Sequence, residues 1–339
     1  MSATARIRSA LIFALFVSAC SIQRQKPESR VSDEHMSHMQ VSDLLTQGAP
    51  NLLVPGRSVV RGTALAGDTP GLPASNNFAA GRLKASPRHA EWVKLAWEPG
   101  SSDSLMAWIV YPSTSNAKTP VVVVIHEIFG LSTWVRNVAD QVAADGFIAI
   151  APDLISRVRG GPSTMELSGD SARKLIGNVG AAERNRGIAA VANYAMALPS
   201  AAPHYAVIGY CWGGSTTWGA AVANGRGFSG GVAFYGLPYM NGAMPIADSL
   251  ARITKPVLLL NGSKDARIAA AMPAIDSAMR ALGKDYAASN YDGAVHGFLR
   301  QQDDPKPTRD TAEEAANLAA TTDGWPRTIA FLKKNLGVK

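Results

Sequence analysis

The residues at positions 121–125, Val-Val-Val-Val-Ile, constrain the fold more than any other segment of this chain. A strand without polar alternation has to be buried on both faces, as happens inside a parallel sheet that helices cover on both sides. Similar apolar runs follow, each after an interval long enough for a crossover helix: 147–150, 206–208, 231–235 and 256–260. This alternation predicts an α/β fold with a doubly wound, mostly parallel sheet flanked by helices.

The segments around these runs complete the expected domain. Helices are expected at 135–145, 181–198, 271–282 and 325–336, which are rich in helix formers and have Gly or Pro near one end. Residues 91–111 are typical of an antiparallel hairpin that turns at Pro99 and Gly100. A single α/β domain over 89–339 therefore accounts for most of the 339 residues, of which 47% are hydrophobic and 17% charged.

The formal net charge of +7 is concentrated at the N-terminal end of the chain. Residues 1–90 hold ten Lys and Arg against five Asp and Glu, which leaves 23 basic and 21 acidic residues for the rest. No cluster of basic side chains with interleaved aromatic residues occurs, so we do not expect nucleic-acid binding.

The first twenty residues have the pattern of an export signal. Arg6 and Arg8 precede an apolar run at 10–17, which is too short to span a bilayer as a helix. The residues at 17–20, Val-Ser-Ala-Cys, resemble the lipobox of bacterial lipoproteins. The resemblance implies a signal peptide over 1–20 and a membrane anchor made by lipidation of Cys20. An ordinary cleaved signal with a chance cysteine is the alternative.

The same resemblance implies a cellular location for the protein. An anchored lipoprotein is exported to the bacterial periplasm or cell envelope, and Ser21 after the lipidated cysteine favours the outer membrane. Residues 21–88 contain scattered Pro, Gly, Ser and Asn, so we expect a linker or a loosely ordered extension there.

The segment 209–214, Gly-Tyr-Cys-Trp-Gly-Gly, follows an expected strand and has the layout of a nucleophile elbow. Only small residues fit two positions either side of the nucleophile, because the backbone turns sharply there. A helix expected at 214–223 would aim its N-terminal amides at Cys211 and lower the pKa of the thiol. The alternative is a buried cysteine that packs as a small hydrophobic residue.

Two partners for Cys211 follow it in the chain. Asp265 comes after the strand expected at 256–260, and His296 lies on a later loop. The order nucleophile, acid, histidine is that of α/β-hydrolases, so we expect Asp265 to fix the tautomer of His296, and His296 to carry the proton. Asp265 could instead cap a helix beginning near Ala266, and His296 could be an ordinary loop histidine.

The segment His-Glu-Ile-Phe-Gly at 126–130 follows the first buried strand, where hydrolases of this fold supply an oxyanion-hole amide. The backbone N–H groups of Ile128 and Trp212 are therefore expected to bind the oxyanion. Glu127 is expected to accept a hydrogen bond from the Cys211 thiol and to keep it neutral until substrate arrives. The alternative for Glu127 is a salt-bridged or solvated loop acid.

These motifs together resemble the dienelactone hydrolase family from about residue 86 to residue 336. The resemblance is carried by Ser-Pro-Arg-His-Ala-Glu-Trp-Val at 86–93, the 126–131 and 209–214 segments, Ala-Pro-Asp-Leu at 151–154, Asp265, and His-Gly-Phe-Leu-Arg at 296–300. It implies an α/β-hydrolase fold, a Cys/Asp/His triad, a gating Glu127 and hydrolysis of an enol-lactone.

The resemblance also implies how substrate binds. Arg300 occupies the position of an arginine that binds the substrate carboxylate, and Arg173 stands where family enzymes carry a tyrosine. Arg157, Arg159 and Arg173 either rebuild an anion site or form an exposed basic loop.

We therefore expect a hydrolase that cleaves small esters or lactones, anionic ones included, through Cys211, with no metal and no cofactor. Two alternatives stay open: a surface lipoprotein that binds a ligand or partner without turnover, and an acyltransferase that uses the same residues. A disulfide between Cys20 and Cys211 is not expected, since each has a separate role.

Overall fold

The computed structural model describes residues 67–98, 100–114, 118–163, 169–238, 246–302 and 311–338, all within the unit Val31–Lys339. The predicted signal peptide, Cys20 and the predicted extension up to residue 66 lie outside the described residues. In chain order the helices and strands are α2 (Asn76–Ala85), β1 (Ala90–Ala96), β2 (Ser104–Val110), β3 (Thr119–Ile125), α3 (Thr133–Ala144), β4 (Ile148–Asp153), α4 (Ser156–Arg159), α5 (Gly169–Gly177), α6 (Ala181–Met196), β5 (Ala201–Tyr210), α7 (Trp212–Ala223), β6 (Phe228–Phe234), α8 (Ile246–Ala251), β7 (Val257–Gly262), α9 (Ala266–Ala281), β8 (Tyr286–Tyr291) and α10 (Thr311–Asn335).

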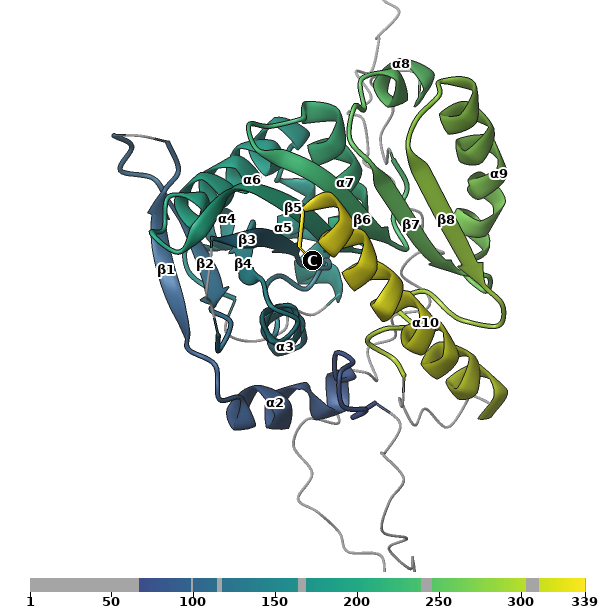
Figure 1. The fold of residues 1–339 in the computed structure, drawn as a ribbon, viewed down its shortest axis with the longest axis horizontal. Coiled ribbons are helices and arrows are strands. Elements are labelled where there is room, and N and C mark those ends of the chain that lie inside the picture. The colour runs from purple at the N-terminus through teal and green to yellow at the C-terminus, as the bar shows by residue number, and fades with distance from the viewer. Residues whose placement is uncertain are drawn as a thin grey trace, which may run out of the picture. The chain divides into compact units, whose positions relative to one another are not determined.

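Eight strands of the described part form one sheet in the order β1-β2-β4-β3-β5-β6-β7-β8 (Figure 1). β2 pairs antiparallel with β1 and with β4, and every other neighbouring pair is parallel. All seven residues of β3 are buried, as the β-branched run predicts. The doubly wound, mostly parallel α/β sheet is therefore confirmed. Its strand order reverses beside β3, and ligands of such sheets bind at the carboxyl ends of the strands there.

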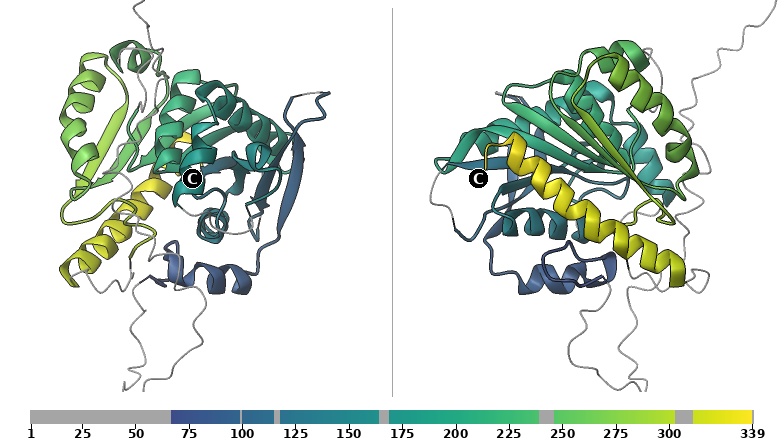
Figure 2. Two further views of the ribbon diagram at one scale, coloured as in Figure 1. Left: turned by 180° about the vertical axis from the view of Figure 1, so that it is seen from behind. Right: turned by 45° about the vertical axis from the view of Figure 1, so that its right-hand side comes forward.

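The helices cover both faces of the sheet. α3 and α10 lie on one face, and α6, α7 and α9 lie on the other (Figure 2). This arrangement follows from right-handed crossovers that run first toward β4 and then, in the opposite direction, toward β8. Both faces of β3 are thereby covered by helices, which agrees with the burial of all seven of its residues.

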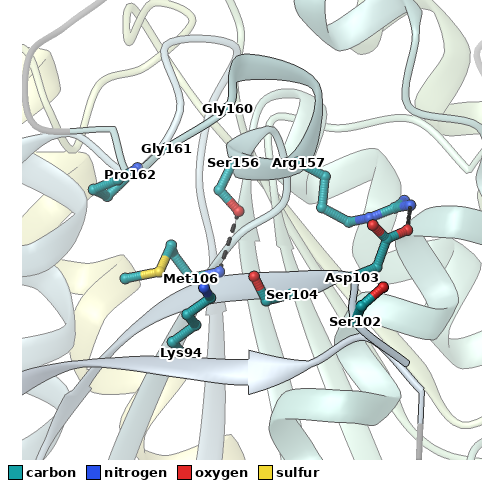
Figure 3. Close-up of a pocket in the computed structure, with 10 residues that line it drawn as sticks. All are labelled: Lys94, Ser102, Asp103, Ser104, Met106, Ser156, Arg157, Gly160, Gly161 and Pro162. Carbon is teal, nitrogen blue, oxygen red and sulfur yellow. Dashed lines mark hydrogen bonds and ion pairs between the residues drawn. The ribbon is translucent and has the colours of Figure 1, made fainter. Parts of the chain in front are cut away.

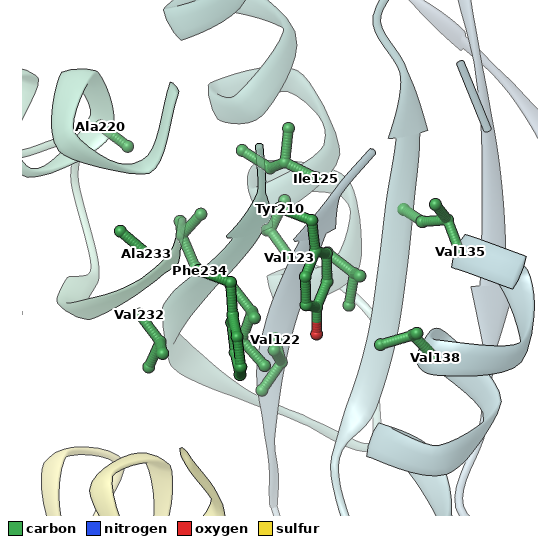
Figure 4. Packing of buried hydrophobic residues seen from close by; sticks show 14 of the residues in the cluster. Val122, Val123, Ile125, Val135, Val138, Tyr210, Ala220, Val232, Ala233 and Phe234 are labelled. Carbon is green, nitrogen blue, oxygen red and sulfur yellow. The ribbon is translucent and has the colours of Figure 1, made fainter. Parts of the chain in front are cut away.

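The core lies around the central strands. In Figure 4, Val135 and Val138 of α3 and Ala220 of α7 approach the sheet from opposite sides. The Tyr210 ring packs 4.9 Å from the Phe234 ring, and both are fully buried. Full burial of a side chain of this size stabilises the fold by roughly 1.5–3 kcal/mol, so the strand that precedes Cys211 is firmly held.

Residues 67–88 differ from the prediction. α2 lies in this segment, and the Ala74 N–H donates to the Asn137 side chain of α3 over 3.1 Å. Arg88 forms a 2.5 Å ion pair with Asp140 of the same helix. The expectation of a loosely ordered extension is therefore wrong for 67–88, because polar contacts from α3, which local composition does not reveal, hold the segment in place.

Two of the expected helices are longer than predicted. α9 begins at Ala266 and contains Pro273, and α10 begins at Thr311 and contains Pro326. Packing against the sheet stabilises these helices beyond the propensity of their residues, so the prolines do not end them. None of the helices in the described part is both long enough and apolar enough to cross a bilayer.

Candidate active site

Cys211 lies at the sharp turn between β5 and α7. Its backbone has φ 56° and ψ −114°, a strained conformation for a residue with a side chain. A Cβ on Gly209 would lie 2.0 Å from the Gly213 carbonyl oxygen, and one on Gly213 would lie 2.5 Å from the Ile125 carbonyl oxygen. Glycine is therefore required at both positions, which matches the predicted elbow geometry.

The structure brings Asp265 and His296 together as predicted. His296 Nδ1 lies 2.6 Å from Asp265 Oδ2, and the side chains are 8% and 7% exposed. Burial lowers the pKa of this imidazole, but the negative charges and hydrogen bonds of Cys211 and Asp265 outweigh it and raise the pKa to about 10. The three groups thus form one electrostatically coupled cluster, in which the protonated form of His296 is favoured.

Asp265 also caps the helix that follows it, as the alternative interpretation of this residue requires. Its Oδ1 accepts a hydrogen bond from the Ile268 N–H over 3.4 Å at the first turn of α9. One carboxylate oxygen caps the helix and the other faces His296, so the two interpretations are compatible. The cap fixes the side chain that orients the imidazole.

The two amides predicted for the oxyanion hole are both on buried backbone. Ile128 is 5% exposed and Trp212 is 6% exposed. Trp212 is the first residue of α7, so its N–H lies before the hydrogen-bonded part of the helix. Neither N–H donates a backbone hydrogen bond to another described residue. The close approach of Gly213 to the carbonyls of Ile125 and His126 brings the start of α7 against the end of β3.

Glu127 forms an ion pair with Arg300. Glu127 Oε2 lies 3.2 Å from Arg300 Nε, and both residues are buried. The salt-bridged interpretation of Glu127 is therefore realised, while its role in holding the thiol neutral stays a prediction. Removing one partner of a buried ion pair leaves the other charge unpaired and costs about 3–5 kcal/mol, so Glu127 and Arg300 depend on each other.

Arg157 and Arg173, two of the basic residues that follow β4, lie in different surroundings. Arg157 makes 2.5 Å ion pairs with Asp103 and Glu183, and its guanidinium lies 4.3 Å from the centre of the Trp97 ring. These contacts fasten α4 to the hairpin and to α6, so they favour a structural role for Arg157 over an anion site. Arg173 lies half-buried on α5, and its assignment to substrate binding stays a prediction.

Two side chains near the site were not predicted. Tyr235, directly after β6, has φ 39°, and its ring lies 4.9 Å from the His296 ring. Burial and the Glu127 charge raise the pKa of Tyr235 well above its ordinary value, so the phenol stays neutral. His126 is fully buried beside Glu127. The only signal for His126 in the sequence is its place in the strand-end motif.

A separate hollow of about 440 Å³ lies between the β1–β2 hairpin and α4 (Figure 3). Its lining includes Lys94, Asp103 and Arg157, and none of Cys211, Asp265 and His296 contributes to it. Within the described residues no group of three or more His, Cys, Asp and Glu side chains is arranged to hold a metal ion.

Comparison with known proteins identifies the family. The sequence profile of the dienelactone hydrolase family matches residues 105–336. A protein of Escherichia coli (strain K12), provisionally named a carboxymethylenebutenolidase, is 27% identical over 246 residues, which is 71% of this chain and 86% of that protein. A protein of Methylorubrum extorquens with the same provisional name is 31% identical over 214 residues, 61% of this chain and 69% of that protein.

A solved structure supports the same family assignment. A Klebsiella pneumoniae protein, provisionally named a dienelactone hydrolase, superposes with a TM-score of 0.59 at 25% identity, covering 72% of this chain and 98% of its own. The profile match, the relatives and the shared fold all concern the α/β sheet that carries Cys211, Asp265 and His296. This chain belongs to the dienelactone hydrolase family, and it is a hydrolase of that type.

Proposed function

We propose that the protein hydrolyses small carboxylic esters or lactones through the thiolate of Cys211. The observation that carries the proposal is the contact between His296 and Asp265 at 2.6 Å, coupled to a cysteine at a strained elbow. A nucleophile, a base and a group that orients the base are the parts needed for covalent acyl transfer.

The steps follow from the positions of these groups. The Cys211 sulfur attacks the carbonyl carbon, and the oxygen becomes an anion bound by the Ile128 and Trp212 amides. The carbonyl re-forms as the bond to the leaving oxygen breaks, and the His296 imidazolium gives that oxygen its proton. His296 then removes a proton from water, which attacks the thioester and releases the acid and the thiol.

The Glu127–Arg300 ion pair supports an anionic substrate. A substrate carboxylate would compete with Glu127 for the Arg300 guanidinium, since planar bidentate pairing suits both carboxylates. The gating role that the sequence suggested is a hydrogen bond from the Cys211 thiol to Glu127, and a substrate that moves Glu127 away from Arg300 would end that contact. The provisional carboxymethylenebutenolidase name of the Escherichia coli relative agrees with an anionic lactone as the substrate.

We propose further that the enzyme is exported and anchored to the membrane through a lipid on Cys20, in the cell envelope. This location is supported by the pattern of an export signal, which consists of Arg6, Arg8, the apolar run at 10–17 and the 17–20 motif. Several acyl chains on one residue give stable attachment, so the catalytic domain would act beside the bilayer.

Turnover of p-nitrophenyl acetate and butyrate tests the proposed function. We expect Cys211→Ala to lower kcat/KM by about a thousandfold or more, because the nucleophile is lost. The chain offers a matched control in Cys20→Ala, which should keep the wild-type rate. A Cys211→Ala enzyme that hydrolyses these esters at the wild-type rate would show that the proposal is wrong.

The same assay separates the alternatives. If the wild-type protein binds esters but releases no p-nitrophenol, a binding role replaces hydrolysis. If p-nitrophenol appears but the acyl group is recovered as an ester of an added alcohol and not as the free acid, the protein is an acyltransferase. Free acid as the main product supports hydrolysis.

A further inference from the structure

His126 has contacts at both ring nitrogens, and these fix its tautomer. Nδ1 lies 2.6 Å from the Glu127 carbonyl oxygen, and Nε2 lies 3.1 Å from the Leu154 backbone nitrogen. A carbonyl oxygen only accepts and a backbone N–H only donates, so Nδ1 carries the proton and Nε2 carries none. Complete burial lowers the pKa of His126 to about 4, which agrees with a neutral ring.

The contact to Glu127 controls the direction of a neighbouring amide. The Glu127 C=O and the Ile128 N–H belong to one planar, trans peptide unit, so they point in opposite directions. That carbonyl accepts from His126 Nδ1–H and, over 3.3 Å, from the Gly130 N–H. Two donors therefore hold the peptide in one orientation, and the Ile128 N–H is directed away from His126.

The same ring contacts the other half of the predicted oxyanion hole. The rings of His126 and Trp212 are stacked, with centroids 5.4 Å apart and planes 12° from parallel. Trp212 is the first residue of α7 and supplies the second predicted amide. His126 thus contacts the ends of β3 and β4 and the start of α7, three segments that are distant in the sequence.

We propose that His126 is a positioning residue for the oxyanion hole: the neutral Nδ1–H tautomer aims the Ile128 N–H, and its stacked ring sets the distance to the Trp212 N–H. The inference rests on the proposed function, because it concerns the same reaction. His126 does not touch the reacting atoms, and its effect is on the alignment of the two donors.

Three substitutions separate the contacts of the ring. Asn in place of His126 keeps a donor near the Nδ1 position, Gln places an acceptor near the Nε2 position, and Phe keeps only the stacked ring. We expect His126→Phe to lower kcat for p-nitrophenyl butyrate by about 10- to 100-fold with KM changed less than about threefold, since misaligned donors act mainly in the transition state. His126→Asn should lose less activity than His126→Gln.

A pair of inhibitors distinguishes oxyanion alignment from general damage. A trifluoromethyl ketone adds to the thiolate and forms an oxyanion in the hole, whereas iodoacetamide alkylates the thiolate without one. We expect His126→Phe to bind the ketone about 10- to 100-fold more weakly than wild type and to be alkylated at the wild-type rate. The alkylation rate reports whether the triad is intact in each variant.

The possible failures point to different conclusions. If Cys211→Ala retains esterase activity, the proposed function is wrong. If Cys211→Ala is inactive but the His126 variants keep the wild-type kcat and ketone affinity, only the role of His126 is wrong. If His126→Phe does not fold, the Asn and Gln variants decide: equal losses of kcat and ketone affinity in the two would overturn the proposal.

Discussion

At the scale of single residues, the candidate site combines a cysteine in a strained conformation with a strongly coupled histidine. Cys211 is held at φ 56° by its glycine neighbours, and the His296 pKa is raised to about 10 although burial alone would lower it. Because the raised pKa depends on the negative charge of Asp265 as well as on Cys211, neutralising Asp265 should weaken the thiolate–imidazolium pair.

This predicts a shift in the pH dependence of thiol reactivity in Asp265→Asn. In the wild type the His296 imidazolium persists toward pH 10, and its positive charge stabilises the thiolate, so iodoacetamide should alkylate Cys211 at pH 6 as well as at pH 8. In the variant the imidazolium is less stable, so the alkylation rate at pH 6 should fall by about tenfold and recover as pH rises toward the ordinary thiol pKa of about 8.5.

The measurement is the alkylation rate against pH on a Cys20→Ser background, which leaves Cys211 as the sole thiol. Asp285→Asn, a change of the same kind at an exposed position before β8, should leave the profile unaltered. An identical profile for Asp265→Asn and the wild type would contradict the coupling described here.

At the scale of elements, the segment 67–88 forms hydrogen bonds with the loop that carries Arg300. The Asn76 N–H donates to the Arg300 carbonyl over 2.9 Å, and the Gln302 side chain donates to the Pro73 carbonyl over 3.0 Å. On the other side the segment is joined to α3 through Asn137. α2 therefore supports both the helix that follows Glu127 and the loop that follows His296.

Asn137→Ala should reveal the strength of this attachment. Asn137 is 2% exposed, and without its side chain the Ala74 N–H has no acceptor there, which should reduce the free energy of unfolding by about 1–3 kcal/mol. Urea unfolding of the purified protein measures the change. Asn193→Ala, at an exposed position on α6, is the control and should alter stability by less than about 0.5 kcal/mol. Equal stabilities of the two variants would show that the contact is unimportant.

At the scale of the whole molecule, the proposed anchor on Cys20 and the catalytic domain are separate functions of one chain. Nothing in the mechanism uses residues before position 67, so attachment and catalysis are expected to be independent. The proposal predicts that Cys20→Ala moves the protein from the membrane fraction to the soluble fraction of the cell envelope, with its specific esterase activity unchanged.

Fractionation followed by immunoblotting and ester hydrolysis measures both quantities. Ser21→Ala, which leaves the cysteine in place, should remain in the membrane fraction. Recovery of the wild-type protein in the soluble fraction would favour an ordinary cleaved signal and overturn the lipid anchor.

The sequence by itself determined the α/β sheet and the identity and order of Cys211, Asp265 and His296. These depend on local signals: the β-branched apolar run at 121–125 is typical of a strand buried on both faces, and the glycines around Cys211 are required by a single turn. Strand-end loops of a parallel sheet meet at one edge, so position in the chain was enough to bring the three side chains together.

Only the tertiary structure decided which polar groups pair. The ion pair of Glu127 with Arg300, the hydrogen bond from the Leu154 N–H to His126 and the docking of 67–88 on α3 all join residues far apart in the chain. A buried charge or amide has to find a partner, but the sequence does not say which of several partners comes within about 3 Å. The proposed nucleophile could therefore be predicted from its neighbours in the sequence, whereas the alignment of the groups around it depends on the packed fold.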